Sequence, residues 1–332
     1  MAESETNVQV IKEYKDRKVR MVVLGIIQLL LGCLALLMSA GVIANSLIAA
    51  HRGGGEVNLK QLIVGAAVYL LIAVCLFWLG IGLILTRRWA RAISLILSWF
   101  WLLAGVFGFV FMLIMIPTML KVMSQGNTPK ALVAGIMIGM MGVLSIFYVI
   151  LPALFVLLLS GNQVKMTCEN RDAKVRWTDR CPLPVLALSL IVGMWAVSML
   201  FMGAYNWTIP VFGYVVTGTV GACVILIEAV FIVYAAWALY RLKIAGWWIS
   251  LIFSILIFAS TTVSFLKIDF AEYFQKMGLS PQQYNEMQQM NFKNMLILYG
   301  VWCVGLIIYM AFIRKYFKQA KQESVLQVEE IK

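Results

Sequence analysis

Glu228 is the one acidic residue that lies inside a long apolar stretch of this sequence. At 100° of rotation per residue in a helix, the small or polar residues Gly213, Thr217, Gly221 and Ala235 fall within about 60° of it. An ionised carboxylate inside a bilayer costs at least ~2.5 kcal/mol, so the neutral acid is favoured unless water reaches it. Glu228 and Thr217 are therefore candidates for an intramembrane polar site, which serves either proton or cation coupling or a structural hydrogen bond.

Two pairs of serines form the second candidate site within the apolar stretches. Ser94 and Ser98 lie on one face of a predicted helix, and Ser250 and Ser254 lie at the same positions 156 residues later. Small residues let helices approach closely in lipid, and hydroxyl groups can hydrogen-bond from one helix to another. The serines are interpreted either as close helix packing or as part of the same polar site as Glu228.

The most distinctive polar segment runs from residue 161 to residue 184 and carries five basic and three acidic residues. Its two cysteines have no histidine or second cysteine pair beside them, so they lack the four ligands of a structural zinc site unless two chains contribute. The tryptophan between them is typical of a segment at a membrane interface. The segment predicts either an interfacial connector whose charges pair internally or a surface for a cytoplasmic partner. The candidate interaction residues are Cys168, Arg171, Arg176, Trp177, Asp179, Arg180 and Cys181.

Two runs in this segment resemble a linker of uncharacterised bacterial multi-pass inner-membrane proteins. The runs are Thr167 to Asp172 and Arg176 to Pro182, and the close likeness covers roughly 20 residues. The chain departs from that pattern at Ala173, where the family has proline. The resemblance implies a location in the bacterial inner membrane and carries no activity with it.

The sequence holds few of the groups that catalysis needs. It contains one histidine, and we find no catalytic triad, no zinc spacing and no phosphate-binding glycine loop in it. Enzymes need pairs of acids, histidine clusters or a nucleophile with its base. We therefore expect no enzymatic activity, no cofactor and no bound metal.

The composition indicates that the elements carrying these residues cross a membrane. Apolar residues make up 62% of the 332 and charged residues 13%, against about 25% charged in soluble proteins. The apolar residues fall in blocks of 20 or more, each long enough to cross a hydrocarbon layer of about 30 Å. Eight spans are predicted: Met21 to Ala50, Leu62 to Leu85, Ala92 to Leu120, Leu132 to Ser160, Val185 to Tyr205, Val211 to Tyr240, Trp247 to Leu266 and Met295 to Phe317.

The distribution of Lys and Arg predicts the orientation, because these residues are retained on the cytoplasmic side during insertion. Of the 27, twenty fall on the side of the N-terminus and seven on the opposite side. Both termini are therefore expected in the cytoplasm, with the chain in the cell inner membrane and the lipid bilayer as its first partner. The net charge of +12 then reflects topology, and the sequence has no clustered basic patch for nucleic acid.

The two halves of the chain resemble each other. Beyond the serine pairs, the basic turn Arg87-Arg88 aligns with the turn from Arg241 to Lys243 at the same shift. Four spans in each unit insert both halves the same way up, with a pseudo-twofold axis along the membrane normal. The prediction is an all-α integral membrane protein whose eight transmembrane helices form two parallel four-helix repeats. The expected segments are 1–20 (cytoplasmic), 21–160 (first unit), 161–184 (cytoplasmic linker), 185–317 (second unit) and 318–332 (cytoplasmic tail).

Three further local patterns predict structure. Phe270, Tyr273, Phe274 and Met277 recur at helical spacing and predict a short amphipathic helix on the outer membrane surface. A Ser-Pro pair at 280–281 predicts the start of a helix that runs into the eighth span. Pro117 and Pro152 predict kinks in the third and fourth spans.

Two classes of function remain. The first is a non-enzymatic membrane protein of scaffold or sensor type, which meets a cytoplasmic protein partner or a second copy of itself through the linker. The alternative is a small-solute or ion transporter with Glu228 in its path. Access of water to Glu228 would distinguish the two.

Overall fold

The computed structural model describes residues 15–51, 59–123, 130–278 and 292–330. It is 87% helical, and eight of its helices are long and apolar enough to cross a membrane. The predicted class, a multi-pass protein with eight apolar spans, is therefore confirmed.

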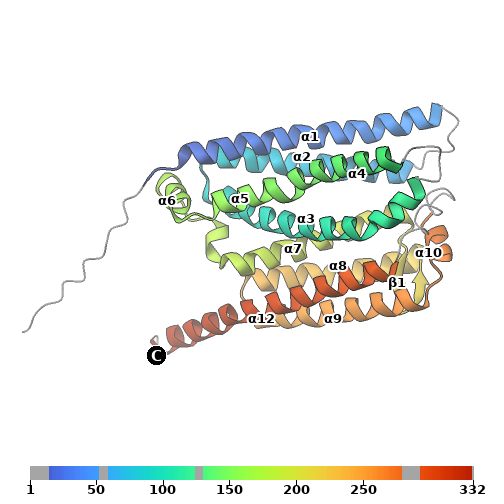
Figure 1. The fold of residues 1–332 in the computed structure, drawn as a ribbon. Helices are drawn as coiled ribbons and strands as arrows, with labels where there is room; N and C mark the ends of the chain where they lie inside the picture. Colours follow the sequence, from blue (N-terminus) through green and yellow to red (C-terminus); the bar gives the residue numbers. More distant parts are fainter. Residues whose placement is uncertain (1–14, 52–58, 124–129, 279–291, 331–332) are drawn as a thin grey trace, which may run out of the picture.

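The eight spans follow the predicted blocks closely. The first three are α1 (Lys18–His51), α2 (Leu59–Ile84) and α3 (Arg88–Met123), and the fourth consists of α4 (Lys130–Ser145), a π-helical turn η1 (Ile146–Ile150) and α5 (Leu151–Leu159). The second group consists of α7 (Leu183–Leu200) with the 3₁₀ turn η3 (Phe201–Tyr205), α8 (Gly218–Tyr240), α9 (Ile244–Lys267) and α12 (Phe292–Glu330). The two groups lie side by side, and their spans run between the same two ends of the molecule (Figure 1).

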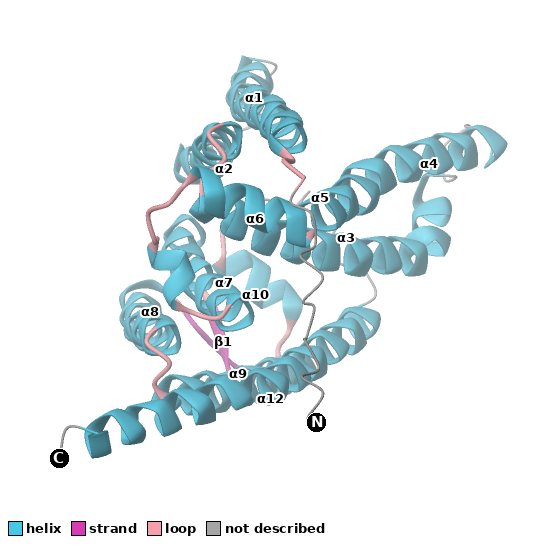
Figure 2. Ribbon diagram, turned by 90° about the vertical axis from the view of Figure 1, so that its left-hand side faces the viewer, coloured by secondary structure: helices cyan, strands magenta, loops and turns pink. Residues whose placement is uncertain are grey.

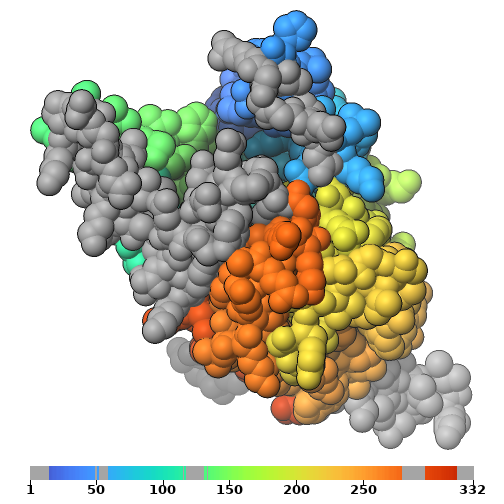
Figure 3. Space-filling model, turned by 90° about the vertical axis from the view of Figure 1, so that its right-hand side faces the viewer, coloured from blue at the N-terminus to red at the C-terminus, as the bar shows by residue number. Residues whose placement is uncertain are grey.

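Short elements mark the two ends of the bundle. At one end lie α6 (Asn162–Arg171) and the 3₁₀ turn η2 (Trp177–Arg180), and we name this the linker end. At the other, the hairpin end, lie β1 (Ile209–Val211), β2 (Tyr214–Val216) and α10 (Phe270–Lys276) (Figure 1). Figure 2 shows α6 lying across the linker end, and Figure 3 shows the surface of the hairpin end.

The sixth span begins later than the sequence pattern predicts. Residues 211–217 were expected to be helical, but they form the end of β1, a tight turn and β2. Phe212 and Gly213 occupy the turn with φ of 46° and 91°, which is the left-handed region that two-residue hairpin turns require. The turn is held on α9, because its backbone N–H groups donate to Ser260 Oγ and Ser264 Oγ, both at 3.0 Å.

The predicted short helix at the hairpin end is confirmed as α10. Asp269 caps it by accepting a hydrogen bond from the Ala271 N–H at 2.9 Å, and Phe274 is buried. The Ser-Pro pair at 280–281 lies outside the described residues.

Two hydrophobic clusters hold the bundle together, and both lie toward the linker end. One joins α1, α2, α3, α5 and α6, with Ala90 and Leu95 contributed by the first turns of α3. The other joins α7, α8, α9 and α12, and it also contains Ile96 of α3. Because neighbouring residues of α3 enter different clusters, this helix connects the two groups of spans.

The α2–α3 and α8–α9 turns have the same backbone geometry. Each has a non-glycine residue in the left-handed region, Thr86 with φ 53° and Leu242 with φ 54°. Each ends its helix with the two hydrogen bonds of a Schellman motif. The bonds are Thr86 N to Leu83 O and Arg87 N to Gly82 O in the first turn, and Leu242 N to Leu239 O and Lys243 N to Ala238 O in the second, all 2.9 Å.

A glycine–alanine contact closes each of these turns. A Cβ placed on Gly82 would lie 2.5 Å from the Cβ of Ala90, so one member of this pair must lack a side chain. In the second turn a Cβ on Gly246 would lie 2.7 Å from the Cβ of Ala238. Gly82 belongs to α2, the helix before its turn, whereas Gly246 belongs to α9, the helix after its turn.

The fourth span is interrupted where Pro152 predicts a kink. Proline has no N–H to donate within the helix, and its ring displaces the carbonyl four residues before it. The helix adapts with the π-helical turn, in which the Leu151 N–H bonds to Ile146 O. The Tyr148 carbonyl faces Gly105 of α3 so closely that a Cβ on Gly105 would collide with it.

Candidate functional site

Asp172 forms the centre of an ion-paired cluster at the linker end. Asp172 follows directly after α6, and its side chain is 3% exposed. The Arg176 guanidinium donates to both carboxylate oxygens, with Nη2 3.2 Å from Oδ1 and Nε 3.3 Å from Oδ2. Arg87 Nη1 lies 3.4 Å from Oδ1, and the Arg88 backbone N–H donates to Oδ2 at 3.3 Å. The α2–α3 turn and the linker are thus joined through one carboxylate.

The surroundings of Asp172 keep it ionised. Burial acts to raise the pKa of this carboxyl, but hydrogen bonds from Arg176 and Arg88 and the nearby positive charges outweigh it. The pKa of Asp172 is therefore lower than usual, and the cluster is charged at neutral pH.

Arg88 and Arg91, in the first turn of α3, fix the rest of the linker. Arg88 Nη2 donates to the Glu169 carbonyl at 3.0 Å, and its Nη1 lies 4.0 Å from Asp179 Oδ2. Arg91 Nε donates to the Leu159 carbonyl at 3.1 Å. These contacts hold the end of α5, the last turn of α6 and η2 against the start of α3.

The segment just before α1 also docks on α6. The Lys15 N–H donates to Gln163 Oε1 and the Arg17 N–H to Thr167 Oγ1, both at 3.0 Å. Asp16 and Arg171 form an ion pair of 2.5 Å, and the hydrogen bond from Arg171 lowers the pKa of Asp16. The linker is therefore folded. Its helix α6 contacts the segment before α1, and α6 and η2 both contact the start of α3.

The two linker cysteines belong to different hydrophobic clusters. Cys168 packs with the first group of spans and Cys181 with the second, and both side chains are buried and unpaired. Burial raises the pKa of each thiol to about 11, so neither is a reactive thiolate near neutral pH. Their role in the structure is to anchor the linker to both cores.

The outward surface of the linker is formed by the residues between α6 and α7. Val175 is 63% exposed, and Lys174 and Arg180 are exposed beside it. Trp177 is partly exposed and fixed from behind, since its carbonyl accepts a hydrogen bond of 3.1 Å from the Tyr240 hydroxyl at the end of α8.

Glu228 lies on the buried side of α8. The buried residues Gly221, Ile225, Ile232 and Ala235 recur three or four positions apart, and Glu228 is in the middle of this stripe and half-buried. Within the described part of the chain, it has no hydrogen-bond or ion-pair partner.

The helical face predicted around Glu228 does not extend as far back as expected. Thr217 precedes α8 with an extended backbone (φ −141°, ψ 169°), and Gly213 belongs to the hairpin turn. Neither residue is part of α8, so neither lies on the helical face that carries Glu228. The cause is the hairpin, which replaces the first two turns of the predicted span.

Three of the four candidate serines donate to carbonyls of their own helices, and the fourth, Ser94, bonds to a side chain of α1. Ser98 Oγ donates to Ser94 O, and Ser254 Oγ donates to Ser250 O, both at 2.7 Å. The Ser250 hydroxyl donates to the carbonyl of Gly246 in its own helix, at 2.8 Å. None of these hydroxyls pairs with Glu228 in the described residues, so they support helix packing.

Gln28, a buried amide in the third turn of α1, was not predicted as part of a site. Ser94 Oγ lies 3.3 Å from Gln28 Oε1, so the two side chains join α1 to α3. A polar residue inside an apolar span was the signal that could have identified it.

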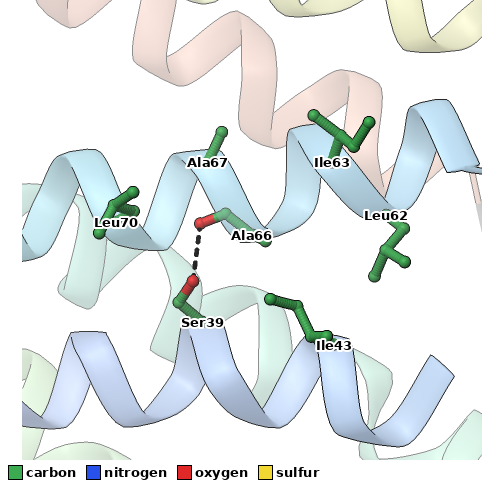
Figure 4. Close-up of a pocket in the computed structure, with 7 residues that line it drawn as sticks. All are labelled: Ser39, Ile43, Leu62, Ile63, Ala66, Ala67 and Leu70. Atoms are coloured by element: carbon green, nitrogen blue, oxygen red, sulfur yellow. Dashed lines mark hydrogen bonds between the residues drawn. The ribbon is translucent and has the colours of Figure 1, made fainter. Parts of the chain in front are cut away.

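Two apolar hollows open on the surface toward the hairpin end. One, with a volume of about 370 Å³, lies between α1 and α2, where the Ser39 hydroxyl donates to the Ala66 carbonyl at 3.0 Å (Figure 4). The other, about 300 Å³, lies between α3 and α12 and includes Phe107 and Tyr299. Glu228 lines neither of them.

Chemically, the linker end offers fixed charges and exposed side chains. In the ranges that the structure describes, no three His, Cys, Asp or Glu side chains are grouped so that they could hold a metal ion. A scan against protein-family models and searches of curated proteins and of solved structures found no match to this chain.

Proposed function

We propose that this chain is a non-enzymatic scaffold or sensor of the inner membrane, and that the linker is where a cytoplasmic protein partner binds. The observation that carries the proposal is that the linker is a folded platform, held by the buried Asp172 and anchored in both cores by Cys168 and Cys181. A simple connector between spans needs none of these contacts. A partner that binds this platform acts on both groups of spans at once.

The proposed orientation places the linker end and both termini in the cytoplasm. It is supported by the excess of basic residues around α6 and the α2–α3 and α8–α9 turns. The exposed residues Lys174, Val175 and Arg180 then face the cytoplasm.

We also propose that the two groups of spans are parallel four-helix repeats. The matched Schellman turns and the exchanged glycine–alanine contacts support this, because close packing needs a glycine at that contact and either helix can supply it. The linker then joins two similar units at equivalent ends.

A photo-crosslinking amino acid at Val175 tests the platform in intact cells. We expect one reproducible adduct of defined mass, because Val175 projects from a rigid surface and is 63% exposed. The charge reversals Lys174→Glu and Arg180→Glu, which leave the Asp172 cluster intact, should reduce the yield at least fivefold, measured by immunoblot.

The matched control carries the same crosslinker at Tyr214, which is exposed at the hairpin end. It should give no adduct with the same protein. Equal labelling from both positions, or a Val175 adduct that survives both charge reversals, would contradict a specific linker partner.

The second candidate function, an ion or small-solute transporter, is supported by Glu228. A half-buried carboxyl in the stripe by which α8 packs, without a partner in the described residues, suits a group that binds and releases a proton.

Glu228→Gln and Glu228→Leu separate a transport role from a structural one. If Glu228 carries protons, Glu228→Gln should fold normally and abolish proton flux into proteoliposomes, measured with an entrapped pH dye. If Glu228 is structural, Glu228→Gln should be tolerated, while Glu228→Leu should lower the unfolding free energy by about 1–3 kcal/mol. Wild-type flux and stability in both variants would count against either role.

A further inference from the structure

At the linker end of the second group of spans, two cations lie over tryptophan rings. Lys243 Nζ lies 4.3 Å from the centre of the Trp237 ring. The Arg314 guanidinium lies 5.0 Å from the Trp247 ring and 5.6 Å from the Trp248 ring. We name these five residues the tryptophan rim.

The rim is held at a fixed depth by α8, α9 and α12. The Trp247 indole is buried and donates to the Met310 carbonyl at 2.8 Å, so it provides a fixed surface for Arg314. Trp237 and Trp248 are 44% and 45% exposed at the ends of apolar spans. Exposed tryptophans at such positions lie at the level of the lipid headgroups.

Among the residues that the structure describes, no carboxylate pairs with the cations of the rim. Residues 237–267 and 292–319 contain no Asp or Glu. The three linker acids pair with other cations, Asp172 with Arg87 and Arg176, Asp179 with Arg88, and Glu169 with Lys165. Lys243 and Arg314 instead rest on aromatic rings, which leaves their outward N–H groups free for an anion from outside the chain.

We propose that the tryptophan rim binds the headgroup phosphate of an anionic phospholipid. At the depth set by Trp237 and Trp248, phospholipid phosphate is the abundant anion, and its two fatty chains can lie along the apolar surfaces of α8 and α9. This lipid contact is separate from the linker platform and does not depend on the proposed partner.

Native mass spectrometry of the full-length protein in detergent tests the proposal. The probes are phosphatidylglycerol, phosphatidylcholine and inorganic phosphate, titrated separately. We expect phosphatidylglycerol to be retained in preference to phosphatidylcholine, and the double variant Arg314→Gln, Lys243→Gln to bind it about 25-fold more weakly, about fivefold for each cation removed.

The matched control is Lys174→Gln with Arg180→Gln, which removes the same charge from the same end without touching the rim. It should retain phosphatidylglycerol as the wild type does, and so should the charge-conserving Arg314→Lys, Lys243→Arg variant. Circular dichroism and gel filtration check that each variant is folded.

Three results would overturn the proposal. The first is an equal loss of phosphatidylglycerol binding in the control, which would show that net charge alone explains the binding. The second is undiminished binding in the folded double variant. The third is inorganic phosphate or phosphatidylcholine binding as tightly as phosphatidylglycerol.

Discussion

Asp172→Asn should lower the unfolding free energy by about 3 kcal/mol, the largest loss that we expect from a single neutralised charge. Removing one partner of a buried ion pair leaves the other charges uncompensated, at a cost of about 3–5 kcal/mol. Here the neutral amide would face Arg176 and Arg87 and could not accept every hydrogen bond that the carboxylate accepts. Reversible unfolding in mixed detergent micelles measures the loss.

The same carboxylate predicts a dependence on pH. Its pKa is lowered in the folded chain, so its contribution is present above the ordinary carboxyl pKa of about 3.9 and is lost as pH falls through the folded value. The wild type should therefore lose stability below about pH 4 more steeply than Asp172→Asn does.

Asp16→Asn is the matched control for Asp172→Asn. Asp16 also pairs with an arginine, Arg171, but both side chains are well exposed, so water screens the pair. Its removal should change the stability little. Equal losses in the two variants would show that the buried position of Asp172 does not matter.

The spans could be predicted from the sequence, because a helix that crosses a membrane must be both long and apolar. The same criterion explains the error at the sixth span. Val211, Val215 and Val216 extend the apolar run without a charge, although they form strands. The signals against a helix were local: Gly213 at the turn and β-branched residues on either side of it.

The contacts of the linker could not be predicted from the sequence. In the sequence, Asp172 is one of several charged residues in a polar segment. Its burial depends on Arg87 and Arg88, which lie more than 80 residues earlier in the chain. The same applies to Cys168 and Cys181, which were candidates for an interaction surface but are buried in two different clusters. Sequence spacing does not show which of two cores a side chain enters.

The kink at Pro152 was predictable, but its consequence for α3 was not. Pro152 marks the interruption in the fourth span. The space for that interruption is provided by α3. A carbonyl that leaves its helix must find room, and Gly105 provides that room by having no side chain.

Gly105→Ala should therefore lower the unfolding free energy by about 2–3 kcal/mol, the usual upper range for an overpacked core. The added methyl group would collide with the Tyr148 carbonyl, which is backbone and cannot rotate away. Gly108→Ala is the matched control on the same helix, because nothing lies within 4 Å of a Cβ at that position. It should be neutral or stabilise α3 by about 0.5–1 kcal/mol, since alanine favours helix more than glycine does.

Pro152→Ala tests the cause, because it restores an N–H that can bond to the Tyr148 carbonyl in a regular helix. If proline pushes that carbonyl against α3, the double variant Gly105→Ala, Pro152→Ala should recover at least about 1 kcal/mol of the loss, a coupling typical of residues in contact. Strict additivity of the two substitutions would show that the π-helical turn is fixed by other contacts. A Gly105→Ala variant as stable as Gly108→Ala would show that the two helices can move apart at no cost.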